Sequence, residues 1–353
     1  MPDRTLEMLM KRDFGETILR VEGLAMRYPI STGLFARKIG EVRAVDDVSF
    51  TVAKGETLAL VGESGSGKTT TARCIIRAAN PSAGEVWFRN EGEMLRISDL
   101  PRRELRPVRR GMQMIFQDPF SSLNPRMTLA QIIGEPMQVH RSCDPKERMD
   151  RVAELLRLVG LRPEYANRFP HAFSGGQRQR IGIARALALN PDFIIADEPV
   201  SALDVSVQAQ ILNLMLELQD RMGLSYLMVS HDLSVVRHVS DRIAVMYLGR
   251  LVEIADTLAL FDAPRHPYTA ALLSAIPVPD PRKRGALPPP PGEIANPANP
   301  PSGCHFHPRC PFATDVCRES VPRLEEVTAG RLVRCHRAKE LGPIEPERSC
   351  RST

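Results

Sequence analysis

Residues 62–69 have the spacing of a loop that binds the phosphates of a nucleotide. The segment fits the pattern G-x-x-x-x-G-K-[ST] without a mismatch. Glycines let backbone N–H groups and a helix N-terminus face a polyphosphate, and Lys68 adds a positive charge. The hydroxyl of Thr69 is suited to bind Mg²⁺. We therefore predict a nucleoside triphosphate site formed by Gly62, Ser64, Gly65, Ser66, Gly67, Lys68, Thr69 and Thr70.

The residues around this loop support the interpretation. The apolar run 57–61 is typical of a buried strand, and residues 68–76 can continue as a helix. The alternative is a Gly- and Ser-rich turn before an ordinary helix, and eight matching positions in this context disfavour it.

Two carboxylates follow another apolar run, residues 193–196. Asp197 can hold Mg²⁺, and Glu198 can orient an attacking water. A polar turn after a strand is the alternative for an Asp-Glu-Pro sequence taken alone. The presence of Lys68 elsewhere in the chain favours the catalytic interpretation.

Two more polar side chains follow predicted strands. His231 comes two residues after the run 226–229, at the end of that predicted strand, and could contact the terminal phosphate. Gln117 follows residues 114–116 and could contact the metal or its water. Each side chain taken alone would be an ordinary loop residue, so both depend on the motifs above.

Residues 174–177 form a second candidate anion-binding surface. The serine and two glycines precede a stretch that is typical of a helix, so backbone N–H groups are available there. One nucleotide cannot easily contact this segment and the phosphate loop of the same chain. We therefore expect a second chain to complete the site with Ser174, Gly175, Gly176 and Gln177.

The remaining pattern predicts an α/β fold. Residues 18–24 and 48–52 alternate like antiparallel strands, with a connection of more than twenty residues between them. Residues 128–168 change to the period of amphipathic helices. Apolar runs then alternate with helical segments, which indicates a parallel sheet with binding groups at the carboxyl ends of its strands.

Composition limits the function classes. The chain has 353 residues, suited to about two domains, and 47 basic against 42 acidic residues. That small excess disfavours a primary nucleic-acid binder. No apolar run is long enough to span a bilayer, and the N-terminus lacks the apolar core of a signal peptide. We expect a cytosolic protein.

The C-terminal part has a different composition. Residues 277–301 contain ten prolines and predict a linker or extended strap. The cysteines that follow are separated by five, six and seventeen residues, which fits neither common zinc spacings nor the ferredoxin run. An iron–sulfur cluster, zinc and unmetallated thiols all stay open for Cys304, Cys310, Cys317 and Cys335.

These motifs, in this order, resemble the ATP-binding cassette (ABC) family over residues 18–262. The resemblance implies two nucleotide domains that meet head to tail, with Mg²⁺ and ATP between them. It implies that Lys68 and Thr69 bind phosphate and Mg²⁺, and that Tyr28 stacks on adenine, although an aromatic residue in a first strand often only packs. The other implied roles are the Mg²⁺ carboxylate for Asp197, the metal or water contact for Gln117, the general base for Glu198, the switch for His231 and a nucleotide-site contact for Asp204.

A closer resemblance is to the ATPase subunits of dipeptide and oligopeptide importers. It rests on residues 28–30 with 33–35, 117–126, 266–269 and 303–311. It implies a peripheral protein on the cytoplasmic face of the membrane, with a second, paralogous ATPase chain, two permeases and an extracytoplasmic solute-binding protein. Relatives import nickel, glutathione or other small solutes, and a soluble ABC protein acting on DNA or ribosomes is the alternative from another class.

The resemblance also favours a [4Fe-4S] cluster on the four cysteines, with Zn²⁺ as the alternative. We therefore expect an ABC-type P-loop domain with a mixed core sheet, a helical subdomain and antiparallel strands, followed by a small Pro- and Cys-rich extension. The expected domains are a polar leader at 1–16, the ATPase domain at 17–262 with its helical subdomain at about 120–175, a helix and Pro-rich linker at 263–301, and a Cys-rich region at 302–353.

Overall fold

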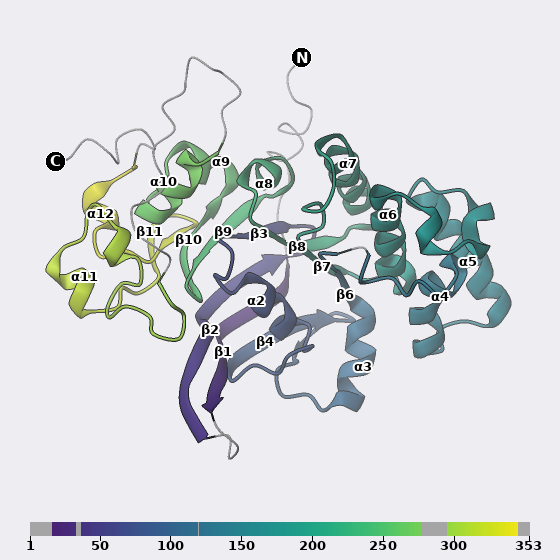
Figure 1. The fold of residues 1–353 in the computed structure, drawn as a ribbon, viewed down its shortest axis with the longest axis horizontal. Helices are drawn as coiled ribbons and strands as arrows, with labels where there is room; N and C mark the ends of the chain where they lie inside the picture. The colour runs from purple at the N-terminus through teal and green to yellow at the C-terminus, as the bar shows by residue number, and fades with distance from the viewer. Residues whose placement is uncertain (1–15, 33–36, 119, 277–294, 345–353) are drawn as a thin grey trace.

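Figure 1 shows the computed structural model, which describes residues 16–32, 37–118, 120–276 and 295–344. Residues 1–15 of the predicted leader and most of the predicted Pro-rich linker lie outside the described residues, as do residues 33–35 of the importer-like motif. No described helix combines the length and the apolar character that crossing a membrane requires.

An eight-stranded sheet forms the centre of the molecule, in the order β11-β12-β10-β9-β3-β8-β7-β6. Its strands β9, β3, β8, β7 and β6 run parallel, and β10, β12 and β11 extend one edge antiparallel. The strands are β3 (Thr57–Val61), β6 (Met112–Ile115), β7 (Phe193–Asp197), β8 (Ser225–Ser230), β9 (Arg242–Tyr247), β10 (Arg250–Asp256), β11 (Glu325–Thr328) and β12 (Arg331–Val333).

The central strands are apolar on both faces because both faces are covered. In β3, Ala59 and Val61 join one buried cluster with the helices, whereas Leu58 and Leu60 join a second cluster with the antiparallel sheet. The sheet therefore separates two cores, and the polar groups at its carboxyl edge lie between them.

A second sheet is antiparallel, in the order β2-β1-β4-β5. The sequence predicted a connection of more than twenty residues between its first two strands, and this prediction is wrong. Most of that connection is strand, since the pairing of β1 with β2 continues as far as Thr32 and Arg37. The strands are β1 (Thr17–Thr32), β2 (Arg37–Ala53), β4 (Ala83–Asn90) and β5 (Glu93–Arg96).

Helices between β6 and β7 form a lobe at one end of the molecule (Figure 1). Three of them begin with a capping box, in which Thr128, Asp144 and Ser174 each accept from a backbone N–H three residues on. The lobe comprises α4 (Leu129–His140), α5 (Pro145–Leu158), η1 (Pro163–Asn167), η2 (Pro170–Ala172), α6 (Gly175–Ala186) and η3 (Leu187–Leu189).

The other helices cover the sheets. They are α2 (Lys68–Ile75), α3 (Arg102–Gly111), α7 (Val205–Met222), α8 (Leu233–Val239), α9 (Thr257–Asp262) and α10 (Pro267–Ser274). Helix α3 is rich in arginine, and it buries Leu105 and Val108 between its arginines.

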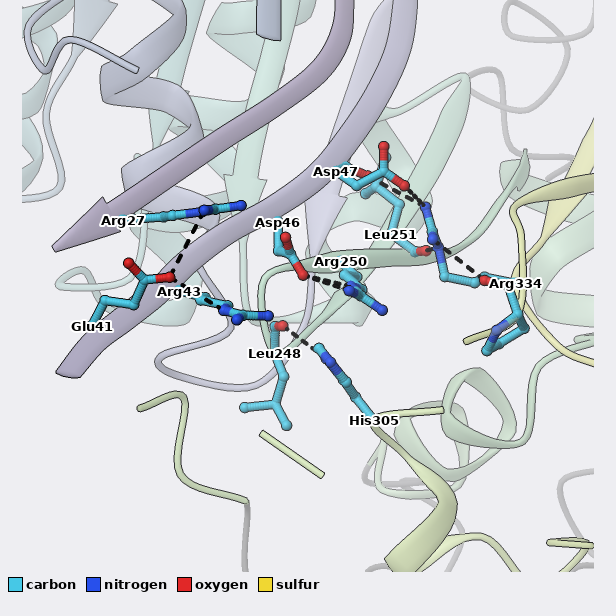
Figure 2. A network of polar contacts seen from close by, with 11 residues as sticks. Arg27, Glu41, Arg43, Asp46, Asp47, Leu248, Arg250, Leu251, His305 and Arg334 are labelled. Atoms are coloured by element: carbon cyan, nitrogen blue, oxygen red, sulfur yellow. Dashed lines mark hydrogen bonds and ion pairs between the residues drawn. The ribbon is translucent and has the colours of Figure 1, made fainter. Parts of the chain in front are cut away.

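The C-terminal region lies at the opposite end from the helical lobe (Figure 1). Its strand β12 pairs with β10, and Arg331 forms a buried ion pair of 2.8 Å with Glu253 of that strand. Figure 2 shows two further links, from Arg334 to Asp47 and from His305 to the carbonyl of Leu248. Its remaining elements are η5 (His307–Arg309), α11 (Asp315–Glu319) and α12 (Ala338–Leu341).

Candidate functional site

The phosphate loop connects β3 to the first turn of α2, as its sequence predicts. Gly67 caps α2 with φ of 106°, in the left-handed region that favours glycine. A Cβ atom there would lie 2.1 Å from the carbonyl oxygen of Ala44 in β2. The helix start is therefore pressed against β2, which only a glycine allows.

Lys68 lies beneath the loop with 5% of its surface exposed. Its Nζ donates to the carbonyl oxygens of Gly62 at 2.8 Å and Glu63 at 2.9 Å. Burial lowers the pKa of Lys68, while the nearby carboxylates of Glu198, Asp197 and Glu63 oppose that shift. An anion at this position would replace the carbonyl oxygens as a partner for the ammonium group.

Thr69 and Asp197 place two oxygens side by side. The hydroxyl of Thr69 donates to Oδ1 of Asp197 at 3.0 Å. Asp197 ends β7 and is buried, which raises its pKa, while the hydrogen bond from Thr69 lowers it. A hydroxyl and a carboxylate are the hard oxygen ligands that Mg²⁺ takes, so this pair fits the predicted ion.

Glu198 is held by two side chains from other elements. Nε2 of Gln117 donates to its Oε2 at 2.7 Å, and Nδ1 of His231 lies 3.1 Å from its Oε1. Glu198 adopts φ of 47°, uncommon for a residue with a side chain, and its N–H donates to the carbonyl of Val229 at 2.9 Å. The three side chains predicted for catalysis thus form one contact group at the ends of three parallel strands.

Most of the predicted phosphate-side residues line one cleft. They are Ser64, Gly65, Gly67, Lys68, Thr69, Thr70, Gln117 and Glu198. Gly62 lies beneath it as a partner of Lys68, Ser66 is buried, and Glu198 also lines a neighbouring pocket with His231.

Three residues of this cleft were missed by the sequence interpretation. Val42 and Ala44 come from β2, and Pro297 lies near the end of the Pro-rich segment. The N–H of Arg43 donates to the carbonyl oxygen of Pro297 at 3.3 Å, which holds Pro297 beside β2. No local motif marks these residues, because their proximity arises from pairing over long sequence separations.

Tyr28 does not line this cleft. It lies on β1, opposite Val42 in the strand register, and 42% of its surface is exposed. Its predicted role in stacking on adenine stays a prediction.

The second predicted anion surface lies on the helical lobe and does not line the cleft. Ser174 caps α6, accepting from the N–H of Gln177 at 3.4 Å, and the side chain of Gln177 accepts from the N–H of Ser174 at 3.1 Å. A Cβ atom on Gly176 would lie 2.4 Å from Cγ1 of Val207. Because Asp204 caps α7, which contains Val207, the two helix starts lie close together.

The prediction of a [4Fe-4S] cluster is wrong. Among the residues that the structure describes, no group of three or more His, Cys, Asp or Glu side chains is arranged to hold a metal ion. The zinc alternative has no support from this part of the chain either, since Cys304, Cys310, Cys317 and Cys335 are free cysteines.

The physical reason lies in the surroundings of the thiols. The four cysteines line an apolar pocket with Phe306 and Phe312. Burial raises the pKa of Cys310 to about 12 and that of Cys335 to about 11, and it also raises the pKa of Cys304. Without a metal ion, Cys304, Cys310 and Cys335 are therefore neutral thiols that pack as small apolar side chains.

Two families match the chain at separate positions. The family described as "ABC transporter" matches residues 45–201, and "Oligopeptide/dipeptide transporter, C-terminal region" matches residues 252–317. Together they cover the phosphate loop, the segment at Ser174, the carboxylates of Asp197 and Glu198 at the end of β7, and part of the C-terminal region.

Curated relatives match over most of their length. The oligopeptide transport ATP-binding protein AppF of Bacillus subtilis is 55% identical over 326 residues, which are 91% of this chain and 97% of that protein. A probable peptide ABC transporter ATP-binding protein of Sinorhizobium fredii is 54% identical over 321 residues, 91% of this chain and 90% of that protein.

Solved structures share the fold of the nucleotide domain. The ATP-binding cassette MJ0796, a dimer bound to ADP and Pi in a post-hydrolysis state, is 29% identical with a TM-score of 0.59. The match covers 68% of this chain and 99% of the MJ0796 chain. The protein cbiO1 of Clostridium perfringens is 26% identical, covers 70% of this chain and 92% of that chain, and also has a TM-score of 0.59. The predicted α/β nucleotide-domain fold is confirmed.

Proposed function

This chain belongs to the ATP-binding proteins of the ABC transporter family for oligopeptides and dipeptides. We therefore propose that it is the ATP-hydrolysing motor subunit of a membrane importer for di- and oligopeptides. The family is one of ATPases that bind ATP and Mg²⁺. The observation that carries the proposal is the convergence of Lys68, Thr69, Gln117 and Glu198 on one cleft.

ATP binds at this cleft with its phosphates on the N–H groups of residues 64–69. Lys68 balances the phosphate charge, and Thr69 with Asp197 would hold Mg²⁺, which draws negative charge from the phosphate oxygens. Glu198 accepts a proton from the attacking water, since its carboxylate lies at the cleft wall and is held by Gln117 and His231. Ser174 and Gly176 do not line this cleft, which supports the proposal that they serve a nucleotide on another chain.

A second ATPase chain supplies the other half. In the proposed assembly, Ser174 to Gln177 of each chain face the nucleotide on its partner's phosphate loop, and Asp204 lies at the junction. The dimer with bound ADP and Pi among the similar structures supports this arrangement. We expect the partner to be a related, non-identical chain.

Two permeases bind the nucleotide domains at the cytoplasmic face of the membrane, and an extracytoplasmic protein delivers the peptide. A basic groove between the ATPase core and the helical lobe supports a permease contact. Arg73, Arg77 and Arg109 line it together with Phe116, whose side chain is 47% exposed directly before Gln117. A partner segment in this groove would contact the strand that positions Gln117.

Purification of the intact complex from its membrane tests the assignment. We expect two permeases and a paralogous ATPase to copurify with this chain, and the reconstituted complex to import peptides only with ATP. Copurification with ribosomes or DNA would reverse the assignment. Uptake of nickel or glutathione instead of peptides would keep the motor role and change the cargo.

A further inference from the structure

We propose that Arg309 of the C-terminal region is a positioning residue for the phosphate loop and acts through Glu63. The inference rests on the proposed ATP site and adds a residue that lies 246 positions from its contact in the loop. Within the described residues, Arg309 gives the segment around η5 a direct ion pair with the phosphate loop.

Glu63 is the second residue of the loop, and three of its groups are held. Its N–H donates to Oη of Tyr268 at 2.9 Å, and its carbonyl accepts from Nζ of Lys68 at 2.9 Å. Its carboxylate accepts two hydrogen bonds from the Arg309 guanidinium, at 3.0 and 3.2 Å. The loop conformation at Glu63 is therefore set by α10 and η5 as well as by the loop itself.

Arg309 is fixed where it meets the loop. Its side chain is 6% exposed, and its guanidinium carbon lies 6.0 Å from the Tyr247 ring and 5.9 Å from the Phe306 ring. Phe306 is buried against Tyr268, with ring centroids 5.4 Å apart. A bidentate pair with a buried, immobile arginine loses little entropy on forming and is worth more than a surface pair.

Charge gives the pair a specific role in nucleotide binding. The Glu63 carboxylate is a negative charge close enough to act electrostatically on Lys68, in the loop that receives a polyphosphate. Without its partner this carboxylate would repel the phosphates and compete for Lys68. Arg309 neutralises Glu63, which does not line the cleft, so the arginine should govern ATP affinity more than the rate of the chemical step.

A second buried arginine of the C-terminal region, Arg334, contacts the core without contacting Glu63. Arg334 donates to Asp47 at 3.0 Å and to the carbonyl of Leu251 at 2.9 Å, and it is as buried as Arg309 (Figure 2). Arg334 therefore offers a matched control, an equally buried arginine that joins the same region to the core without touching Glu63.

The test compares ATP turnover by the full-length chain in its complex for Arg309→Met, Arg309→Lys, Glu63→Gln and the double variant Arg309→Met/Glu63→Gln. We expect Arg309→Met to raise the KM for ATP about tenfold with kcat within about twofold of wild type. Arg309→Lys should raise KM about threefold, because it keeps the charge and loses the bidentate geometry. The double variant should recover most of the affinity, because the unpaired carboxylate is gone.

Arg334→Met should lower the melting temperature and leave the KM for ATP unchanged. A wild-type KM in Arg309→Met, or an equal KM increase in Arg334→Met, would overturn the proposal. If Arg309→Met does not fold, Arg309→Lys carries the same test, and a wild-type KM there would overturn it too. A wild-type complex that does not hydrolyse ATP would refute the proposed function instead, so the two failures are distinguishable.

Discussion

The phosphate loop and the Ser174 segment both lead into a helix N-terminus, yet they are anchored in different ways. The loop is held by distant parts of the chain, through Gly249 N–H to the Ser66 carbonyl at 2.9 Å and through Tyr268 and Arg309 to Glu63. Ser174 is exposed, and its hydroxyl accepts from the N–H of its own capping box. The first half-site thus depends on residues far from it in the sequence, whereas the Ser174 cap is made within its own helix start and is exposed to a partner.

The largest loss of ATP hydrolysis should come from a substitution in the half-site that contains the catalytic carboxylate, Glu198. We expect Glu198→Gln to bind ATP but to hydrolyse it at least about 100-fold more slowly, because an amide cannot accept the proton of the attacking water. Phosphate release and nucleotide binding measure the two steps separately. The exposed Glu217→Gln on α7 removes a similar charge away from the cleft and should retain turnover. Wild-type turnover by Glu198→Gln would contradict the role of the carboxylate.

Gly67→Ala tests whether the phosphate loop depends on long-range packing. The substitution places a Cβ at φ of 106° and 2.1 Å from the Ala44 carbonyl, so we expect a stability loss of about 2 kcal/mol or more and ATP affinity at least about tenfold weaker. Gly55→Ala is the matched control, because Gly55 has φ of 78° and no atom within 4 Å of the place that the added methyl group would take. It should cost about 1 kcal/mol and leave ATP affinity intact. Equal ATP affinities for the two variants would remove this explanation for Gly67.

The sequence predicted those parts of the site that depend on local chemistry. A strand, a glycine loop and a helix follow one another at residues 57–76, so their pattern carries both the residue types and the backbone that presents them. The central strands were predictable for the same reason, because burial on both faces leaves continuous apolar runs in β7 and β8.

The parts that the sequence did not predict depend on tertiary packing. Pro297 reaches the cleft through a hydrogen bond to Arg43, and Arg309 reaches Glu63 across 246 positions. Four clustered cysteines suggested a metal centre, yet their spacing does not determine whether the surroundings stabilise thiolates. The apolar pocket with Phe306 and Phe312 favours neutral thiols.

Ser174→Ala should distinguish the role of the second half-site in ATP turnover from the role of the first half-site in ATP binding. Loss of the cap should cost about 1 kcal/mol of stability, and ATP binding by the isolated chain should not change. Turnover of the assembled dimer should fall about threefold, since a partner hydroxyl at the nucleotide is lost. Thr128→Ala removes the same kind of capping box from α4 and controls for helix stability. A similar decrease in turnover for Thr128→Ala would mean that the Ser174→Ala effect comes from lower helix stability and not from a lost contact with the nucleotide.

Acid should loosen the anchor of the phosphate loop without acting on the Ser174 segment. His266 is buried and caps α10, where its Nδ1 accepts from the N–H of Tyr268 at 3.1 Å, and burial lowers the pKa of His266 to about 3. Its unfolded pKa is about 6.5, so below that pH the unfolded chain binds a proton that the folded chain does not. Stability from this group is complete above about pH 6.5 and is lost as the pH falls towards about 3.

Between pH 7.5 and 6 this loss should amount to about 0.8 kcal/mol, measured as the difference in unfolding free energy between wild type and His266→Asn. Asparagine can still accept from the Tyr268 N–H but does not titrate, so the variant should have a shallower pH dependence. His238→Asn on the exposed side of α8 is the surface control. If the unfolding free energies of wild type and His266→Asn changed equally with pH, protonation of His266 would not act on the α10 cap. The anchoring of the phosphate loop would then be independent of pH in this range.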